Sequence, residues 1–415
     1  MPTLLAGTYP SLYLSAFKPI VTLKGKSSAQ PGGAIVRKSL VVFQFVVSVF
    51  FIISTLIAGN QLKYIQEMNT GLNREQVLVI NTGGSPYQKI EVLKNDVLQQ
   101  EGVLSVTASY DSPVNVGGGY TINQADGKNA DFNLSVTAIP IEKSFIKTLG
   151  IKIIAGADLD MGDEQQVRTE KEEDRKYGFV LNEMAVKAMG WSPQQAIGKR
   201  IGLNGRMGTI KAVTNNFNFA SLHEAVTPIV MFPEYDWFGK LLIKTSGKNT
   251  AKVIAAIQSR WKTFSPNTPF EYHFLDEEFD QMYKTDQRTG EILKVFTLVT
   301  IFISCLGLFG LAVFTTRQRV KEIGIRKVLG AGVLNIVGLI SSDFLKLVII
   351  AIVISSPLAY YFMHQWLEDF AYRINIQLWV FALAGGMAVL IAFVTVSYQS
   401  IKAALSNPVN SLRSE

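Results

Sequence analysis

Four long apolar runs dominate the pattern of the chain. The first, Leu40–Gly59, carries no charge and is long enough to cross a hydrocarbon core of about 30 Å at 1.5 Å per residue. The other three are roughly Ile292–Phe314, Phe344–Met363 and Leu378–Ser397. Each predicts a transmembrane helix. Pro357 lies inside the third run, where a membrane helix tolerates it and is expected to kink.

The segment between the first two runs has the alternating pattern of an aqueous domain. Strands are predicted at Gln76–Ile80, Val103–Ser109, Phe132–Ile139 and Gly178–Leu181 and within Ile197–Ile210. Helices are predicted at Lys89–Gln100, Glu183–Met189 and Asn249–Trp261. The charged stretch Asp163–Lys176 favours a loop or hairpin tip, and Gly117–Gly119 a flexible turn. We therefore expect one large α+β insert of two lobes, with both ends at the same membrane face.

Composition agrees with a mixed chain. It has 415 residues, 48% of them hydrophobic, and a mean hydropathy of +0.22, too apolar for an ordinary soluble protein and too polar for one wholly in a bilayer. The net charge of +7 would suit nucleic acid, but the cations gather beside the apolar runs, so no nucleic-acid partner is expected. The single cysteine, Cys305, excludes an intramolecular disulfide, and three histidines far apart in the sequence disfavour a histidine-rich metal site.

Lysine and arginine set the expected orientation. Five basic residues precede the first run: Lys18, Lys24, Lys26, Arg37 and Lys38. Between the second and third runs, residues 317–331 hold five more against the single acid Glu322: Arg317, Arg319, Lys321, Arg326 and Lys327. The loop between the third and fourth runs has only Arg373, against Glu368 and Asp369. Because basic residues favour the cytoplasmic side, both termini and residues 317–331 are expected there, with the large insert outside.

The basic stretch 317–331, RQRVKEIGIRKVLGA, continues into a helical pattern. Seven apolar residues recur at helical spacing: Ile325, Val328, Leu329, Val333, Ile336, Val337 and Ile340. They predict one helix from about Val320 to Ile340 with an apolar stripe and a basic start. Three glycines, Gly324, Gly330 and Gly332, weaken such a helix by about 1 kcal/mol each relative to alanine, and their small size lets another backbone approach.

Four segments together resemble the FtsX/MacB-like permeases of ABC transporters. They are RKSLVVFQFVVSVFFIIST, KEIGIRKVLGA, DFLKLVIIAIVISSPLAYYFM and NPVNSLR. The resemblance implies an α-helical membrane protein with four transmembrane helices and a large α+β extracytoplasmic domain of two lobes between helices 1 and 2, similar to the MacB periplasmic core domain. It implies the bacterial inner membrane, with the large domain in the periplasm.

The expected domains follow from these spans. They are a cytoplasmic N-terminal segment and linker (1–38), transmembrane helix 1 (39–60), the extracytoplasmic domain (61–289), helix 2 (290–315), a cytoplasmic coupling loop or helix (316–342), helix 3 (343–363), an external loop (364–377), helix 4 (378–398) and a cytoplasmic tail (399–415). Met1–Lys26 lacks the pattern of a signal peptide. Its KPIVTLKG echoes the closing NPVNSLRS, by chance or because the chain is the second half of a duplicated permease.

The resemblance also implies a function and partners. The chain would transmit ATP-driven motion from a cytoplasmic ABC ATPase subunit to the external domain, and so export or extrude a peptide, drug or lipid-linked cargo. The alternative is a signalling scaffold that regulates an external cell-wall hydrolase or senses antimicrobial peptides. A homodimer or a pair with a homologous permease half is expected, through the first and second spans, with a periplasmic adaptor or hydrolase as a further partner.

In this family the basic loop is the coupling helix that docks in the ATPase. The contact candidates carried over from it are Glu322, Ile323, Gly324, Arg326, Lys327, Leu329, Gly330 and Ala331. The alternative from the residues themselves is an amphipathic helix lying on anionic lipid, which the same cations would favour.

Catalysis by the chain itself is not expected. The phosphate-binding pattern G-x-x-x-x-G-K-[ST] is matched only at its end, Gly25–Ser27, with Ile20 at the first glycine position. ATP is therefore expected on the partner subunit, with no cofactor, metal or catalytic residue on this chain. A membrane-tethered external enzyme is a third hypothesis that no nucleophile or metal pattern supports. His223 beside Glu224 is interpreted as a surface pair, and the acids from Asp276 to Asp280 as a solvated helix face or, alternatively, a cation site.

Overall fold

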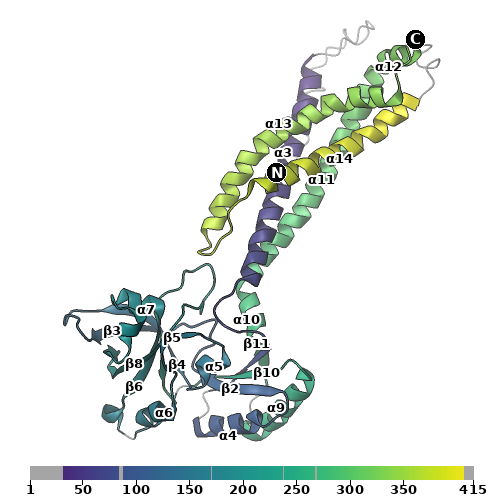
Figure 1. Ribbon diagram of the computed structural model, residues 1–415. Helices are drawn as coiled ribbons and strands as arrows, with labels where there is room; N and C mark the ends of the chain where they lie inside the picture. The colour runs from purple at the N-terminus through teal and green to yellow at the C-terminus, as the bar shows by residue number, and fades with distance from the viewer. Residues whose placement is uncertain (1–30, 84–86, 170, 237, 267–268, 406–415) are drawn as a thin grey trace, which may run out of the picture. The chain divides into compact units, whose positions relative to one another are not determined.

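The computed structural model describes residues 31–83, 87–169, 171–236, 238–266 and 269–405 (Figure 1). The segment before Pro31 and residues 406–415, including both copies of the KPIVTLKG echo, lie outside the described residues. The chain divides into two units. One holds the residues up to Ile57, Ile292–Met363 and those from Ile376 on, and the other holds Ala58–Glu291 and His364–Asn375.

Four helices in the described part of the chain are long and apolar enough to cross a membrane. They are α3 (Pro31–Glu67), α11 (Lys284–Gln318), α13 (Val333–Glu368) and α14 (Leu378–Leu405). The four runs predicted to be helical are confirmed as helices, and each run lies within one of them. All four helices are longer than the apolar runs, because polar residues at their ends continue the same backbone hydrogen bonding.

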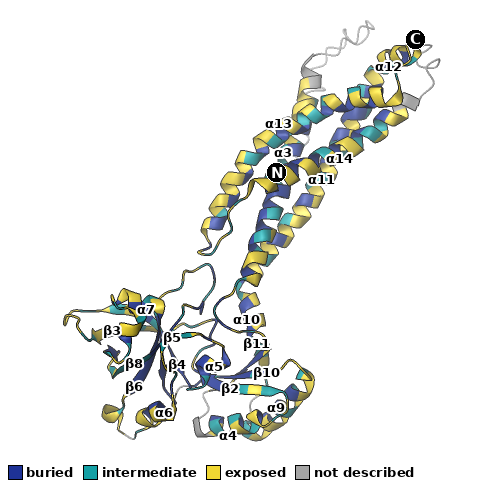
Figure 2. Cartoon of the chain, viewed as in Figure 1, coloured by how far each residue is buried: buried dark blue, intermediate teal, exposed yellow. Residues whose placement is uncertain are grey.

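In the first unit, α3 and α11 are joined by hydroxyl groups. The hydroxyls of Thr55 and Thr297 lie 2.8 Å apart, and Ser304 Oγ donates to the backbone oxygen of Gln44 at 3.0 Å. Gly307 leaves room for the Gln44 side chain, since a Cβ at that glycine would lie 2.1 Å from Gln44 Oε1. Small and hydroxyl-bearing residues are typical where membrane helices pack closely. Exposed apolar side chains continue along all four helices, as expected of surfaces that face lipid (Figure 2).

The described part of the second unit contains one sheet of eleven strands. In chain order these are β1 (Val77–Asn81), β2 (Val103–Ser109), β3 (Gly119–Ala125), β4 (Leu134–Ile141), β5 (Ile153–Gly156), β6 (Tyr177–Asn182), β7 (Arg200–Leu203), β8 (Arg206–Thr214), β9 (Ile229–Pro233), β10 (Lys240–Thr245) and β11 (Tyr272–Phe274). The pairing order is β11-β1-β10-β2-β4-β3-β7-β8-β6-β9, and β5 pairs with β8. Strand β9 also pairs with β4, in parallel. In pairing order, the strands β4, β3, β7, β8, β6 and β9 therefore form a closed circuit.

Three apolar clusters stabilise this unit. Helices α4 (Tyr87–Leu98) and α9 (Thr250–Phe264) share a cluster with β1, β2 and β10 that buries Trp261. Another cluster lies inside the closed circuit and includes Phe179 and Phe232. The third, central cluster joins Ile65 of α3 to the sheet, to α10 (Leu275–Met282) and to Phe370. The remaining short elements are α5 (Phe145–Thr148), α6 (Met161–Val167), the 3-10 turn Glu172–Asp174, α7 (Glu183–Ala188) and α8 (Pro193–Ala196).

The strand predicted at Val103–Ser109 is confirmed at both ends, and the predicted helices agree within a few residues. The loop predicted at Asp163–Lys176 is wrong in its first part, because α6 extends to Val167. Asp160 caps that helix, its carboxylate accepting from the backbone N–H of Gly162 at 2.7 Å and of Asp163 at 3.1 Å. Of the turn predicted at Gly117–Gly119, the first two residues lie outside the strands and helices, and the third begins β3.

Phe232→Ala tests the cluster inside the closed circuit. Phe232 is fully buried, and its ring centroid lies 5.8 to 6.4 Å from those of Tyr120, Tyr177 and Phe179. Truncating a buried phenylalanine leaves a cavity, so the free energy of unfolding should fall by about 3–5 kcal/mol. Denaturant unfolding of the full chain measures this, with Phe232→Leu as a control that should lose less. Equal losses for both variants would contradict a packed aromatic cluster.

Candidate functional site

The predicted coupling residues lie on a short helix and the turn that follows it. The helix α12 (Val320–Val328) is separated from α11 by Arg319 and from α13 by residues 329–332 (Figure 1). Arg319 forms an ion pair with Asp343 of α13 at 3.0 Å, and Asp343 also lies 3.9 Å from Lys346. Arg319 ties the start of α12 to α13.

One continuous helix from Val320 to Ile340 was expected, and this expectation is wrong. Gly330 has a φ of +93°, in the left-handed region that ends helices. The N–H of Gly330 donates to the Lys327 oxygen at 3.1 Å and that of Ala331 to the Arg326 oxygen at 2.9 Å, which is the Schellman arrangement. The glycine predicted only to weaken the helix therefore terminates it.

The break divides the predicted apolar stripe. Its last three members, Ile336, Val337 and Ile340, are buried. The members on α12 and the turn are exposed, with Val328 at 68% and Leu329 at 81%, and the neighbouring Leu334 at 85%. An exposed apolar group of this kind, next to cationic side chains, suits the docking of a partner or a lipid surface.

The eight candidate contact residues are not equivalent. Ile323 and Gly324 are buried, so they contact the rest of the unit. Glu322 and Arg326 are exposed and pair with each other at 2.9 Å across one helical turn. Leu329 and Gly330 are exposed and Lys327 and Ala331 half-buried. The surface that remains available for a partner therefore consists of the Glu322–Arg326 pair and the apolar group around Leu329.

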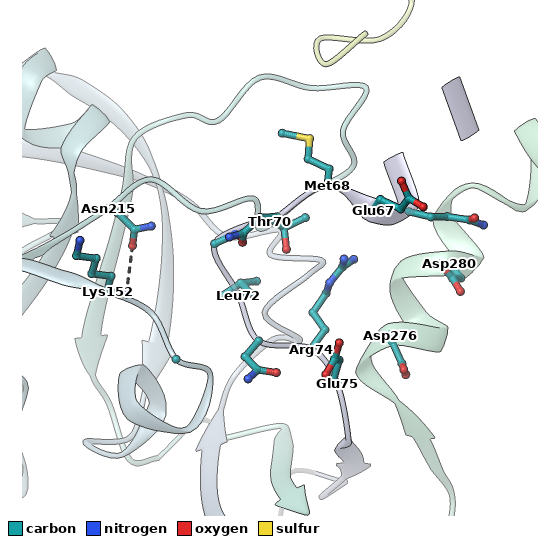
Figure 3. Close-up of a pocket in the computed structure, with 15 residues that line it drawn as sticks. Glu67, Met68, Thr70, Leu72, Arg74, Glu75, Lys152, Asn215, Asp276 and Asp280 are labelled. Carbon is teal, nitrogen blue, oxygen red and sulfur yellow. Dashed lines mark hydrogen bonds between the residues drawn. The ribbon is translucent and has the colours of Figure 1, made fainter. Parts of the chain in front are cut away.

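The second unit contains a polar pocket of about 980 Å³ where α3 ends (Figure 3). It is lined by Gln66, Glu67, Met68, Asn69, Thr70, Gly71, Leu72, Asn73, Arg74, Glu75, Gly150, Lys152, Asn215, Asp276 and Asp280. The Arg74 guanidinium lies 3.5 Å from the centre of the Phe279 ring. Within the described part of the chain, its buried Nη1 has no hydrogen-bond partner.

Burial sets the electrostatics of this pocket. It lowers the pKa of Arg74, against the opposing effect of the Asp280 and Asp276 carboxylates. It also raises the pKa of Asp280, which Arg74 partly counteracts. Carboxylates outnumber cations around the hollow, so its charge is mixed and slightly negative. Sequence reasoning missed Arg74, since only the fold brings it onto Phe279.

The acidic residues of α10 do not form a wholly solvated face. Glu278 accepts from Ser112 Oγ at 2.7 Å and lies 2.9 Å from His273 Nε2. Hydrogen bonds from these two residues lower the pKa of Glu278, although burial opposes them. Among the described residues no group of three or more histidine, cysteine, aspartate or glutamate side chains is arranged to hold a metal ion. His223, expected in a surface pair with Glu224, is half-buried and contacts Asp286 instead.

Residues 294–408 match the family described as FtsX-like permease C-terminal. This part of the chain is similar to an FtsX-like permease C-terminal domain. The resemblance stated from the sequence is confirmed for these residues, which include α12, α13, α14 and most of α11. No curated protein matches the chain.

Three solved structures are each similar to about half of the chain. The periplasmic region of MacB from Actinobacillus actinomycetemcomitans is 15% identical, with 53% of this chain and 98% of that one covered and a TM-score of 0.37. The extracellular domain of the noncanonic ABC-type transporter YknZ from Gram-positive bacteria is 13% identical, with 48% and 98% covered and a TM-score of 0.32. A domain of a putative permease protein from Porphyromonas gingivalis is 14% identical, with 48% and 89% covered and a TM-score of 0.32.

Gly330→Ala tests the turn that ends α12 in the FtsX-like domain. An L-residue in the left-handed region costs about 1–2 kcal/mol, so the turn should open more often. Hydrogen–deuterium exchange of the full chain in lipid should show faster exchange at Gly330 and Ala331. Gly338→Ala is the matched control, because Gly338 lies within α13 with open space around it, and alanine there should stabilise the helix by up to about 1 kcal/mol. Equal effects of the two substitutions would rule out the left-handed turn.

Proposed function

We propose that the chain is the permease subunit of an ABC transporter, and that α12 with the turn after it receives a cytoplasmic ATPase. The exposed apolar group around Leu329, next to the Glu322–Arg326 pair, carries this proposal. If no partner bound at this surface, the apolar side chains of Leu329 and Leu334 would remain exposed to water. The FtsX-like match supports a permease role, in which ATP binds and is hydrolysed on the partner and this chain has no cofactor and no catalytic residue.

A protein partner accounts for this surface better than anionic lipid alone. Lipid binding would need cations around an apolar face but would make no use of an acid among them. Glu322 is such an acid, exposed and directed along the helix toward Arg326. A charge pair of both signs beside an apolar centre is typical of a protein interface, where it sets register and partner choice.

The finer domain assignment belongs to the same proposal. Residues 61–289 form an insert of two lobes in the periplasm, between transmembrane helices 1 and 2, and both termini with residues 316–342 are cytoplasmic. The distribution of lysine and arginine supports this orientation. The sheet supports two lobes, because β2 and β4 are paired only at Ser109 and Ile141, with a separate apolar cluster on either side. The chain would act in the bacterial inner membrane as a homodimer or with a homologous permease half.

Exchanging the charges of the pair on α12 tests the ATPase contact. In Glu322→Lys with Arg326→Glu the two side chains still attract each other across one turn, so α12 should remain folded. A partner that reads the charges would instead meet reversed signs. We expect the affinity for the co-expressed ABC ATPase, followed by co-purification, to fall about 30-fold. This corresponds to the loss of about 2 kcal/mol that is typical of a central interface residue.

The chain offers a matched control for this exchange. Lys63 and Glu67 form another exposed pair one turn apart, on α3 in the second unit. Lys63→Glu with Glu67→Lys should leave the ATPase bound as in the unaltered chain. If both exchanges weaken binding equally, or if neither does, then α12 is not the ATPase contact.

The proposal includes export or extrusion of a peptide, drug or lipid-linked cargo. Proteoliposomes containing the chain with its ATPase test this. We expect ATP-dependent cargo flux that the charge exchange on α12 reduces at least about tenfold, since its effect on coupling is a loss of binding energy. ATP turnover with no flux would contradict export and would indicate the signalling scaffold, whose external partner is a cell-wall hydrolase or an adaptor.

A further inference from the structure

Residues 364–375, which are the end of α13 and most of the loop to α14, belong to the second unit. Phe370 is 1% exposed and belongs to the central apolar cluster, against which Trp366 and Tyr372 also pack. The backbone N–H of Ala371 donates to the His223 oxygen at 3.2 Å and that of Tyr372 to the Leu222 oxygen at 3.3 Å. The loop is therefore anchored to the segment around His223.

A buried side chain of α3 holds the same loop without any titratable group. Gln61 is fully buried. Its Nε2 donates to the Tyr372 oxygen at 2.9 Å, and its Oε1 accepts from the Ile374 N–H at 3.0 Å. Both ends of the amide are used, so this attachment does not depend on pH.

The second polar attachment is His223. Its Nδ1 lies 3.0 Å from the backbone oxygen of Asp369 in the loop, and its Nε2 lies 3.1 Å from Oδ2 of Asp286 on α11. The ring stacks on Phe370 with 4.0 Å between centroids. One imidazole thus connects the loop to the first turn of α11.

Both partners of this imidazole are acceptors. A backbone carbonyl has no proton to donate, and neither has an ionised carboxylate. A neutral imidazole donates from one nitrogen only and presents a lone pair at the other. The two contacts are therefore satisfied together only when His223 carries a proton on each nitrogen, or when Asp286 itself is protonated. In either case the closed arrangement holds one proton more than the neutral ring beside a carboxylate.

None of the contacts described around His223 adds a further proton donor for either ring nitrogen. Tyr283 stacks on the His223 ring with 6.1 Å between centroids, and its hydroxyl already accepts from the Leu222 N–H at 2.6 Å. Burial raises the pKa of Tyr283, so it stays a neutral phenol. The side chains of Glu224 and Asp369 are exposed. The cation that interacts electrostatically with Tyr283 is Arg74.

We propose that His223 is a proton-dependent clasp, which ties the α13–α14 loop to α11 when it is protonated and loosens that tie when it is neutral. Histidine is the side chain whose charge changes between pH 5 and 8, within the range an external compartment reaches. Because the loop continues into both α13 and α14, a tighter loop couples the motion of these helices more firmly to the sheet domain. This last step rests on the proposed function, but the clasp does not.

Hydrogen–deuterium exchange of the full chain in nanodiscs, without ATPase or cargo, tests the clasp. The amides that report are Ala371 and Tyr372, with rates corrected for the intrinsic pH dependence of exchange. Their protection should fall by about fivefold to tenfold from pH 5.5 to pH 8.0, the effect of losing about one hydrogen bond. Protection that is the same at both pH values would overturn the proposal, whatever happens in ATPase binding.

Two variants separate the clasp from general destabilisation. His223→Gln should give low protection at both pH values. Asp286→Asn should give the opposite result, because an amide can donate to the neutral ring while Nδ1–H remains on the Asp369 oxygen. Its protection should stay high and independent of pH, within about twofold of the unaltered chain at pH 5.5. A pH-dependent fall that survives in either variant would assign the effect to another group.

The other histidines provide the matched control. His273 pairs with Glu278, and His364 pairs with Glu368 close to the same loop. The variant His273→Gln with His364→Gln leaves His223 as the only histidine of the chain. It should keep the full pH dependence, and losing it would contradict the assignment to His223.

Discussion

The second unit depends on one central apolar cluster in which remote parts of the chain are removed from water together. Ile65 enters from α3, Phe279 from α10 and Phe370 from the α13–α14 loop. Tyr283, directly after α10, and strand residues such as Val79 also belong to it. Removing one large apolar side chain from such a cluster costs about 3–5 kcal/mol, a large part of the stability of a typical domain. The polar pocket, the Gln61 attachment and the His223 contacts all lie at its margin, so their geometry requires the cluster to be intact.

A different constraint governs the FtsX-like unit. In a bilayer each backbone N–H and C=O must be bonded within the protein, so helices continue without a break across the apolar runs. Breaks are tolerated where the chain leaves the hydrocarbon, and here a break follows α12, at Gly330. The Schellman bonds of Gly330 and Ala331 satisfy the carbonyls that the helix end would otherwise leave open. The backbone of the turn is thus hydrogen-bonded to the end of α12, while the apolar side chain of Leu329 remains exposed.

The sequence predicts the elements whose signal is local. The four spans follow from length and lack of charge, and the strand Val103–Ser109 from its alternation. The continuous helix Val320–Ile340 fails because periodicity does not reveal the positive φ of Gly330. The helix α6 was missed because its aspartates, which the pattern assigns to a loop, serve as its cap. The partners of Gln61 and His223 could not be found, since Tyr372 and Asp286 lie far away in sequence and only the fold brings them there.

The free energies of the individual contacts show how much the central cluster and His223 each contribute to holding the loop in place. Burying a phenylalanine such as Phe370 is worth about 1.5–3 kcal/mol, and the Gln61 amide adds two hydrogen bonds of about 1 kcal/mol each. Loss of a proton from His223 removes about one hydrogen bond. Its free energy is smaller than that of the contacts that remain. The loop therefore stays in place when the clasp opens, and the proton changes how firmly it is held rather than whether it is held.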